Sequence, residues 1–110
     1  MIQMRIQRDR EGLISEFTLQ GHAGFAEAGA DIVCAAVSGI TFGVLRAIET
    51  LLNVTLDIDD DEESGFLHCA IPVSLSGETQ EKMQTLLEGM RVALQAVEEE
   101  YGDYVTIEEV

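Results

Sequence analysis

Length, composition and charge restrict this chain to a small globular protein. It has 110 residues, of which 46% are hydrophobic, so we expect one domain, residues 1–110, with a single core and no extensive disorder. Its formal net charge of −15 repels phosphate backbones, which argues against direct binding to nucleic acid and favours a basic partner.

The first twenty residues predict a β-hairpin. Hydrophobic and polar residues alternate over residues 2–7, with the period of a half-buried strand. After a polar turn, a second strand is predicted over residues 13–20, with Leu13, Phe17 and Leu19 on one face.

A loop and a long helix follow the hairpin. Residues 23–30 are small and include two glycines, which is typical of a mobile surface loop. Asp31 is the expected N-cap of a helix over Ile32–Leu52. Because this helix is apolar nearly all round, we expect it to pack on more than one side.

The next segment predicts a second hairpin. Residues 54–59 alternate as a strand, residues 60–65 form a strongly acidic turn, and residues 66–73 form a fourth strand. One face of that strand, expected in the core, carries Leu67, Cys69, Ile71 and Val73.

A second helix and a last strand complete the chain. Ser76 can cap the helix, hydrophobic residues recur within it at helical spacing, and Gly102 can end it. Residues 104–107 form the last strand. The order β-β-α-β-β-α-β predicts an α+β fold with two helices packed on a mostly antiparallel sheet.

Two features favour the cytoplasm. Cys34 and Cys69 are too few for a disulfide framework and lack a CxxC spacing, and the N-terminus has no signal-peptide core. The uncharged run of residues 32–45 is cut short by Arg46 and Glu49, so we expect no membrane span. Both thiols should be reduced in that compartment.

Cys34 and His22 could support acyl transfer. Cys34 lies in the first turn of the predicted helix, where the helix dipole favours a thiolate and the amides of Cys34 and Ala35 could hold an oxyanion. His22 stands at a strand end and can exchange a proton near neutral pH. By themselves, these residues fit a buried inert thiol and a bystander histidine better than a catalytic pair.

Two neighbours of Cys34 have open roles. Asp31 either only caps the helix or also orients His22 as the third member of a triad. Ser38 lies one turn beyond Cys34 on the same helix face. Its hydroxyl either bonds a carbonyl of the preceding turn or helps to position the thiol.

The loop before the helix could contact a substrate. Gly24 leaves space beside His22, and Phe25 is an exposed aromatic residue that could close over an apolar substrate side chain as a lid. No Lys-Ser/Thr pair follows the loop glycines, so it is not a phosphate-binding loop.

The second thiol predicts no further site. Cys69 is expected in the core as an inert thiol, with His68 on the opposite face of its strand. A zinc site made of His22, Cys34, His68 and Cys69 would lack the paired short spacings of metal sites. We therefore expect neither metal nor cofactor.

Two segments carry a family resemblance. Gly-His-Ala-Gly at residues 21–24 and Asp-Ile-Val-Cys-Ala-Ala-Val-Ser at residues 31–38 resemble the paired signature of the ribosomal-processing cysteine proteases, the Prp family. The resemblance extends over essentially the whole chain, including the acidic hairpin and the final strand.

This resemblance implies a cytoplasmic endopeptidase that removes a short N-terminal extension from a large-subunit ribosomal protein. It implies His22 as general base and Cys34 as nucleophile, with Gly21, Asp31 and Ser38 on further motif positions. It also implies a homodimer, and a loop that moves to admit the peptide.

Two alternatives remain at this point. A non-enzymatic ribosome-assembly factor could bind a basic ribosomal protein through the acidic surface, and its binding would weaken with salt and survive loss of Cys34. A thiol-redox or metal-binding domain would show zinc or a reactive thiol without peptidase activity.

Overall fold

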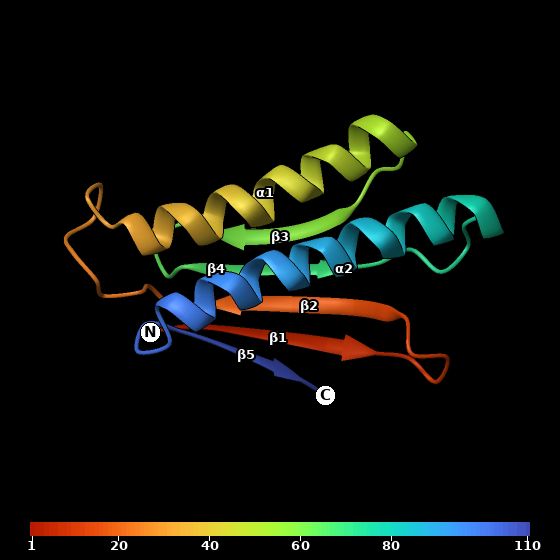
Figure 1. Cartoon of the computed structure of the whole chain (residues 1–110). Coiled ribbons are helices and arrows are strands. Elements are labelled where there is room, and N and C mark those ends of the chain that lie inside the picture. The colour runs from red at the N-terminus through yellow and green to blue at the C-terminus, as the bar shows by residue number, and fades with distance from the viewer.

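Five strands form one sheet, and two helices cover one of its faces (Figure 1). The computed structural model describes residues 1–110. Its elements are β1 (Ile2–Arg8), β2 (Ile14–Gln20), α1 (Ile32–Leu52), β3 (Asp57–Asp61), β4 (Phe66–Ala70), α2 (Gly77–Glu100) and β5 (Val105–Glu109). The predicted order β-β-α-β-β-α-β is confirmed.

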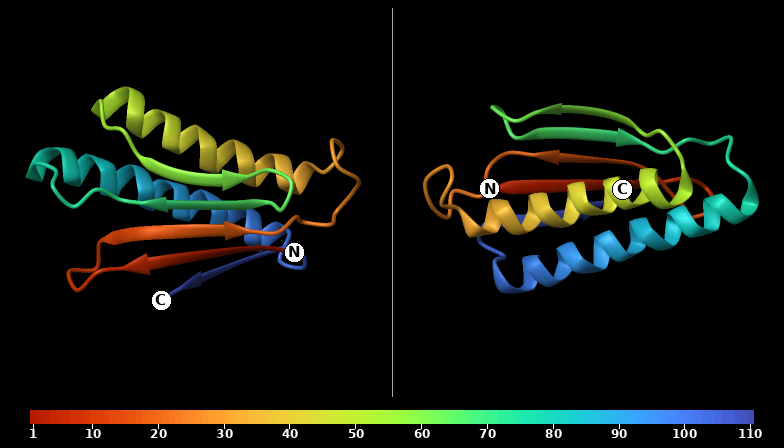
Figure 2. Two further views of the ribbon diagram at one scale, coloured as in Figure 1. Left: turned by 180° about the vertical axis from the view of Figure 1, so that it is seen from behind. Right: turned by 90° about the horizontal axis from the view of Figure 1, so that it is seen from above.

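The sheet is mixed and mostly antiparallel, in the order β3-β4-β2-β1-β5. Only the β1–β5 pair is parallel. The helices lie side by side and run in opposite directions across the sheet (Figure 2). The predicted α+β class is therefore confirmed, and the central β2 ends beside the start of α1.

The core lies between the sheet and the helices. It includes side chains that alternate along the strands, such as Ile6 and Phe17, and side chains at helical spacing on α2, such as Met83 and Leu87. All four are fully buried. Removing their apolar surface from water is the main term that stabilises this arrangement.

A β-bulge changes which residues of β2 are buried. Arg8 pairs with Ile14, whereas Gln7 pairs with Glu16, so the register shifts at this point. Ile14 and Phe17 both enter the core as a result, and Leu13 lies half-buried outside the strand. The prediction of Leu13 on the core face was wrong. It assumed that every second residue before Phe17 faces the core, and the bulge adds one residue to β2 and so breaks that alternation.

The second hairpin is shorter than predicted. β3 begins only at Asp57 and extends to Asp61, so the turn is confined to residues 62–65. β4 ends at Ala70 because Pro72 has no N–H to continue the ladder. Val73, predicted in the core, is 91% exposed.

Helix α1 has the predicted bounds but only one buried stripe. Val33, Val37, Thr41, Leu45 and Ile48 are buried. Its outer face is exposed, so the expectation of packing on more than one side was wrong there. Its length and hydropathy would suffice to cross a membrane, but core helices of soluble proteins pass the same test.

An ion-pair network joins β1, α2 and β5. Glu88 accepts hydrogen bonds from Arg8 at 2.7 and 3.1 Å and from Arg91 at 2.7 Å. Arg8 also contacts Glu109 at 2.8 Å. The hydrogen bonds from Arg8, with a smaller contribution from Arg91, lower the pKa of Glu88 from 4.5 to about 2.

Glu88→Gln should therefore destabilise the protein in a pH-dependent way. The ionised Glu88 is favoured by the fold, so its contribution is complete above pH 4.5 and is lost as the pH falls towards 2. We expect a loss of about 1 kcal/mol at neutral pH, because the side chains are partly exposed, and no difference near pH 2. Urea unfolding of the parent and the variant at neutral pH and near pH 2 measures the difference in the free energy of unfolding at each pH. Glu78→Gln, in an exposed pair with Lys82, is the control and should cost about 0.3 kcal/mol.

Candidate active site

The carboxylate of Asp31 organises the start of α1. Its Oδ1 accepts hydrogen bonds from the backbone N–H groups of Val33 and Cys34, both at 3.0 Å. Asp31 has an extended backbone and is the N-cap, as predicted. This cap places Cys34 in the first turn of the helix, next to the end of β2.

The other carboxylate oxygen of Asp31 holds the preceding loop. Its Oδ2 accepts from the N–H groups of Phe25 at 3.0 Å and Ala26 at 3.2 Å. The hydrogen bond from Cys34, with those from the loop amides and Val33, lowers the pKa of the Asp31 carboxyl. Its bonds all go to the backbone, so in this structure it caps the helix and does not bond His22.

His22 follows β2 and is held by the turn between β3 and β4. Its Nε2 lies 3.1 Å from the carbonyl oxygen of Glu63. Gly21 has a φ of +91°, and a Cβ there would overlap the carbonyl oxygen of Met1. Only glycine fits such a position without strain, so this residue lets the chain turn out of the sheet and carry the imidazole to the turn.

The Cys34 sulfur is half-buried and accepts a hydrogen bond from a loop amide. The N–H of Ala23 donates to Sγ at 3.2 Å. The amides of Cys34 and Ala35 instead donate to the side chain and the carbonyl of Asp31. The prediction that those two amides are free for an oxyanion was therefore wrong, because the helix cap uses them.

Two hollows meet at Cys34. The first, here called the hairpin groove, has a volume of about 240 Å³ and lies between α1 and the β3–β4 hairpin. The second, the loop cavity, has a volume of about 450 Å³ and lies under residues 24–31. His22, Cys34 and Ser38 line both. The structure thus brings the histidine, the cysteine and the serine together.

Phe25 does not line either hollow. Its ring makes edge contacts with Tyr101 and Tyr104, with centroid distances of 5.8 and 5.2 Å. Gly24, which precedes it, has a φ of +73° and open space around it, and it lines the loop cavity. The loop is thus fastened to the end of α2, and a substrate contact by Phe25 stays a prediction.

Cys69 and His68 lie away from this site. Cys69 is fully buried among apolar side chains, as predicted, and burial raises the pKa of its thiol to about 11. His68 lies on the opposite face of β4, with Nε2 3.8 Å from Glu16. No group of three or more His, Cys, Asp or Glu side chains is placed to hold a metal ion.

The sequence did not indicate two backbone groups at this site, the N–H of Ala23 at the sulfur and the carbonyl of Glu63 at the imidazole. Every residue has a backbone N–H or carbonyl group, so the residue type at a position does not reveal that its backbone has such a role. The glycine that ends the acidic turn, Gly65, is the available signal, because its φ of +68° fixes the turn.

A comparison with protein families decides what this arrangement is. The family model of the cysteine protease Prp matches residues 1–106. The chain belongs to the Prp family. It is therefore a cysteine protease, a hydrolase involved in ribosomal processing. This membership favours the enzyme over the non-enzymatic assembly factor.

Relatives cover nearly the whole chain. The ribosomal processing cysteine protease Prp of Bacillus subtilis is 38% identical over 97% of this chain and 96% of its own length. That of Staphylococcus aureus is 36% identical over 97% of both.

Solved structures of the Staphylococcus aureus protease are also similar. The complex with a covalently linked product peptide has a TM-score of 0.89 and 34% identity. The complex with a substrate peptide has a TM-score of 0.84 and 32% identity. Both comparisons cover 100% of each chain.

Iodoacetamide should alkylate the folded protein once, at Cys34. The Cys34 residue lines two open hollows. Cys69 is fully buried, and burial raises the pKa of its thiol to about 11, so little of Cys69 is in the reactive thiolate form. Intact mass and peptide mapping measure the outcome. The denatured protein, which should take two labels, is the control, and labelling of folded Cys69 would contradict the prediction.

Proposed function

We propose that this protein is an endopeptidase that removes a short N-terminal extension from a large-subunit ribosomal protein. Cys34 is the nucleophile and His22 the general base. The observation that carries this proposal is the position of both residues at the junction of the hairpin groove and the loop cavity. An endopeptidase needs space for peptide on both sides of its nucleophile, and the two hollows provide it.

The mechanism proceeds through an acyl-enzyme. His22 takes the proton of the Cys34 thiol, and the sulfur attacks the scissile carbonyl carbon. The C–N bond then breaks, and His22 gives the proton to the leaving amine. Water next attacks the thioester, His22 takes its proton, and the new carboxyl group leaves as the thiol reforms. The covalently linked product peptide of the Staphylococcus aureus relative supports a covalent step.

Ala23 is the backbone donor closest to this chemistry. Its N–H already points at the Cys34 sulfur, so it stabilises a thiolate and lies beside the position where an oxyanion develops. Ala23 is only 4% exposed and belongs to the core. It can therefore remain in place while the loop beyond Gly24 moves to admit the peptide.

The hairpin groove suits a substrate that combines apolar and basic residues. Its lining includes Val37, Phe66 and Leu67, which offer apolar surface, and Asp60 and Asp61, which offer negative charge. Ribosomal proteins bind RNA and are generally basic, so their chains are attracted to such a rim. This charge complementarity supports the choice of a ribosomal protein as substrate.

Cys34→Ala and His22→Ala should each abolish processing of an N-terminally extended large-subunit ribosomal protein. Removal of a nucleophile or of its base typically lowers kcat by a factor of about 10⁴ or more. Mass spectrometry of the substrate after incubation shows loss of the extension, and circular dichroism checks the fold.

Cys69→Ala is the matched control, because it removes the other thiol. It should leave kcat within about a factor of two while lowering stability by roughly 1 kcal/mol, since it opens a small cavity in the core. Processing at the normal rate by Cys34→Ala would contradict the proposed function.

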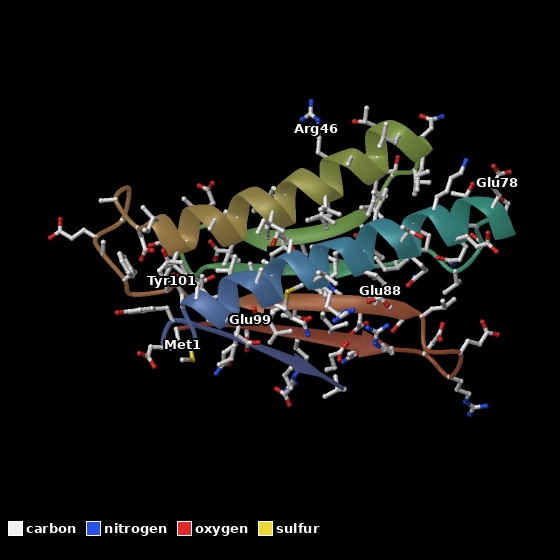
Figure 3. All side chains as sticks on the ribbon, viewed as in Figure 1. Met1, Arg46, Glu78, Glu88, Glu99 and Tyr101 are labelled. Atoms are coloured by element: carbon white, nitrogen blue, oxygen red, sulfur yellow. The ribbon has the colours of Figure 1, made fainter.

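We also propose that the enzyme works as a homodimer in the cytoplasm. The exposed face of α1 includes Ile32, Gly39 and Gly43. Its exposed charged residue is Arg46 (Figure 3), whereas Glu49 is half-buried and accepts a hydrogen bond from the N–H of Leu56. Two copies with a net charge of −15 repel each other, and no acidic residue of α1 is fully exposed on this face. It is therefore the surface on which two copies meet with the least repulsion.

Gly43→Glu should convert the dimer to a monomer. A side chain at Gly43 meets no atom within 4 Å in a single chain, so the fold tolerates it, but the new charge would face its copy. Sedimentation equilibrium measures the mass. Gly89→Glu, on α2 and equally free of neighbours, is the control and should remain dimeric. A monomeric parent protein would contradict this proposal.

A further inference from the structure

The turn between β3 and β4 holds the catalytic histidine. The Nε2 atom of His22 lies 3.1 Å from the carbonyl oxygen of Glu63. A carbonyl can only accept a hydrogen bond, so Nε2 must carry the proton. In the neutral ring, Nδ1 is then the nitrogen with a free lone pair.

We propose that the backbone carbonyl of Glu63 is the positioning group of the catalytic pair, so that Nδ1 of His22 takes the Cys34 proton. The inference rests on the proposed roles of His22 and Cys34. The carbonyl fixes the tautomer and the orientation of the ring, and its dipole stabilises the imidazolium that forms. These are the tasks that a carboxylate performs in a catalytic triad, and Asp31 is occupied by four backbone amides.

The turn is built to keep this carbonyl beside the imidazole. The N–H of Gly21 donates to the carbonyl of Gly65 at 2.9 Å, which joins the end of β2 to the turn. The N–H of Glu63 donates to Oδ1 of Asp61 at 3.1 Å. The backbone on both sides of the His22–Glu63 contact is thus held by hydrogen bonds.

Gly65 makes the close approach possible. Its φ is +68°, and a Cβ there would lie 2.5 Å from the carbonyl oxygen of Gly21 and 3.0 Å from Cε1 of His22. Any side chain would therefore push the turn away from the imidazole. The side chain of Glu63 is not involved, because the contact uses its backbone.

The first test observes the tautomer directly. The protein has two histidines, so the imidazole ¹⁵N spectrum of the full chain labelled at histidine is simple, and His22→Gln assigns it. At a pH where His22 is neutral, we expect a protonated Nε2 and an unprotonated Nδ1. A proton on Nδ1 of neutral His22 would overturn the inference without affecting the assignment of the nucleophile.

The second test weakens the acceptor alone. An ester in place of the amide between Glu63 and Ser64 leaves a carbonyl that is a poorer acceptor, and the N–H of Ser64 makes no hydrogen bond in the structure. The native Cys34 and Cys69 allow the full chain to be ligated from segments 1–33, 34–68 and 69–110, with lactic acid as residue 64.

The matched control for the ester chain is the ligated Ser64→Ala chain, which has the same side chain and a normal amide. We expect the ester to lower kcat about threefold to tenfold, with KM unchanged, because one hydrogen bond to the reacting histidine is weakened. Equal kcat for the ester and amide chains would overturn the inference, whereas cleavage by His22→Ala would overturn the proposed function itself.

A third comparison uses the turn glycine. Gly65→Ala should lower kcat at least tenfold and change the His22 ¹⁵N shifts. Gly12→Ala is the control. Its φ of +85° makes the backbone strain of an alanine similar, but a Cβ at Gly12, in the first hairpin, meets nothing within 4 Å. This variant should keep kcat and the spectrum. A folded Gly65→Ala with normal kcat would contradict the positioning role.

Discussion

The site depends on one carboxylate, that of Asp31. Its two oxygens accept four backbone hydrogen bonds, two from the start of α1 and two from the preceding loop. The same group therefore sets the first turn that carries Cys34 and closes the loop over it. Because the cap uses the amide of Cys34, the donor left facing the sulfur is the N–H of Ala23. A single acidic side chain thus decides which amide faces the sulfur.

The two proposed catalytic residues and the proposed positioning carbonyl come from segments that meet only in the folded chain. Cys34 is carried by the start of α1, His22 by the end of β2, and the carbonyl of Glu63 by the acidic turn. The end of β2 is tied to the turn by the hydrogen bond from the Gly21 N–H to the carbonyl of Gly65, and to α1 by the bond from the Ala23 N–H to the Cys34 sulfur. Small residues in between leave two hollows, and a peptide can approach the sulfur from both sides.

Charge is distributed unevenly around this framework. The acidic hairpin borders the groove at Cys34, where it can attract a basic chain. No acidic residue of α1 is fully exposed, and Arg46 points away from the sheet on the outer face of the helix (Figure 3). The partly exposed network around Glu88 joins the helix layer to the sheet on the other side. The acidic rim of the groove, the outer face of α1 and the network around Glu88 therefore lie on different surfaces.

The sequence by itself determined the element order, the bounds of α1 and the cap at Asp31, because period and capping chemistry are local signals. Tertiary structure alone decided the bulge that buries Ile14, the use of the helix amides by the cap, and the contact of His22 with the carbonyl of Glu63. These depend on backbone groups and strand register, which every residue type shares and which only the packed chain brings together.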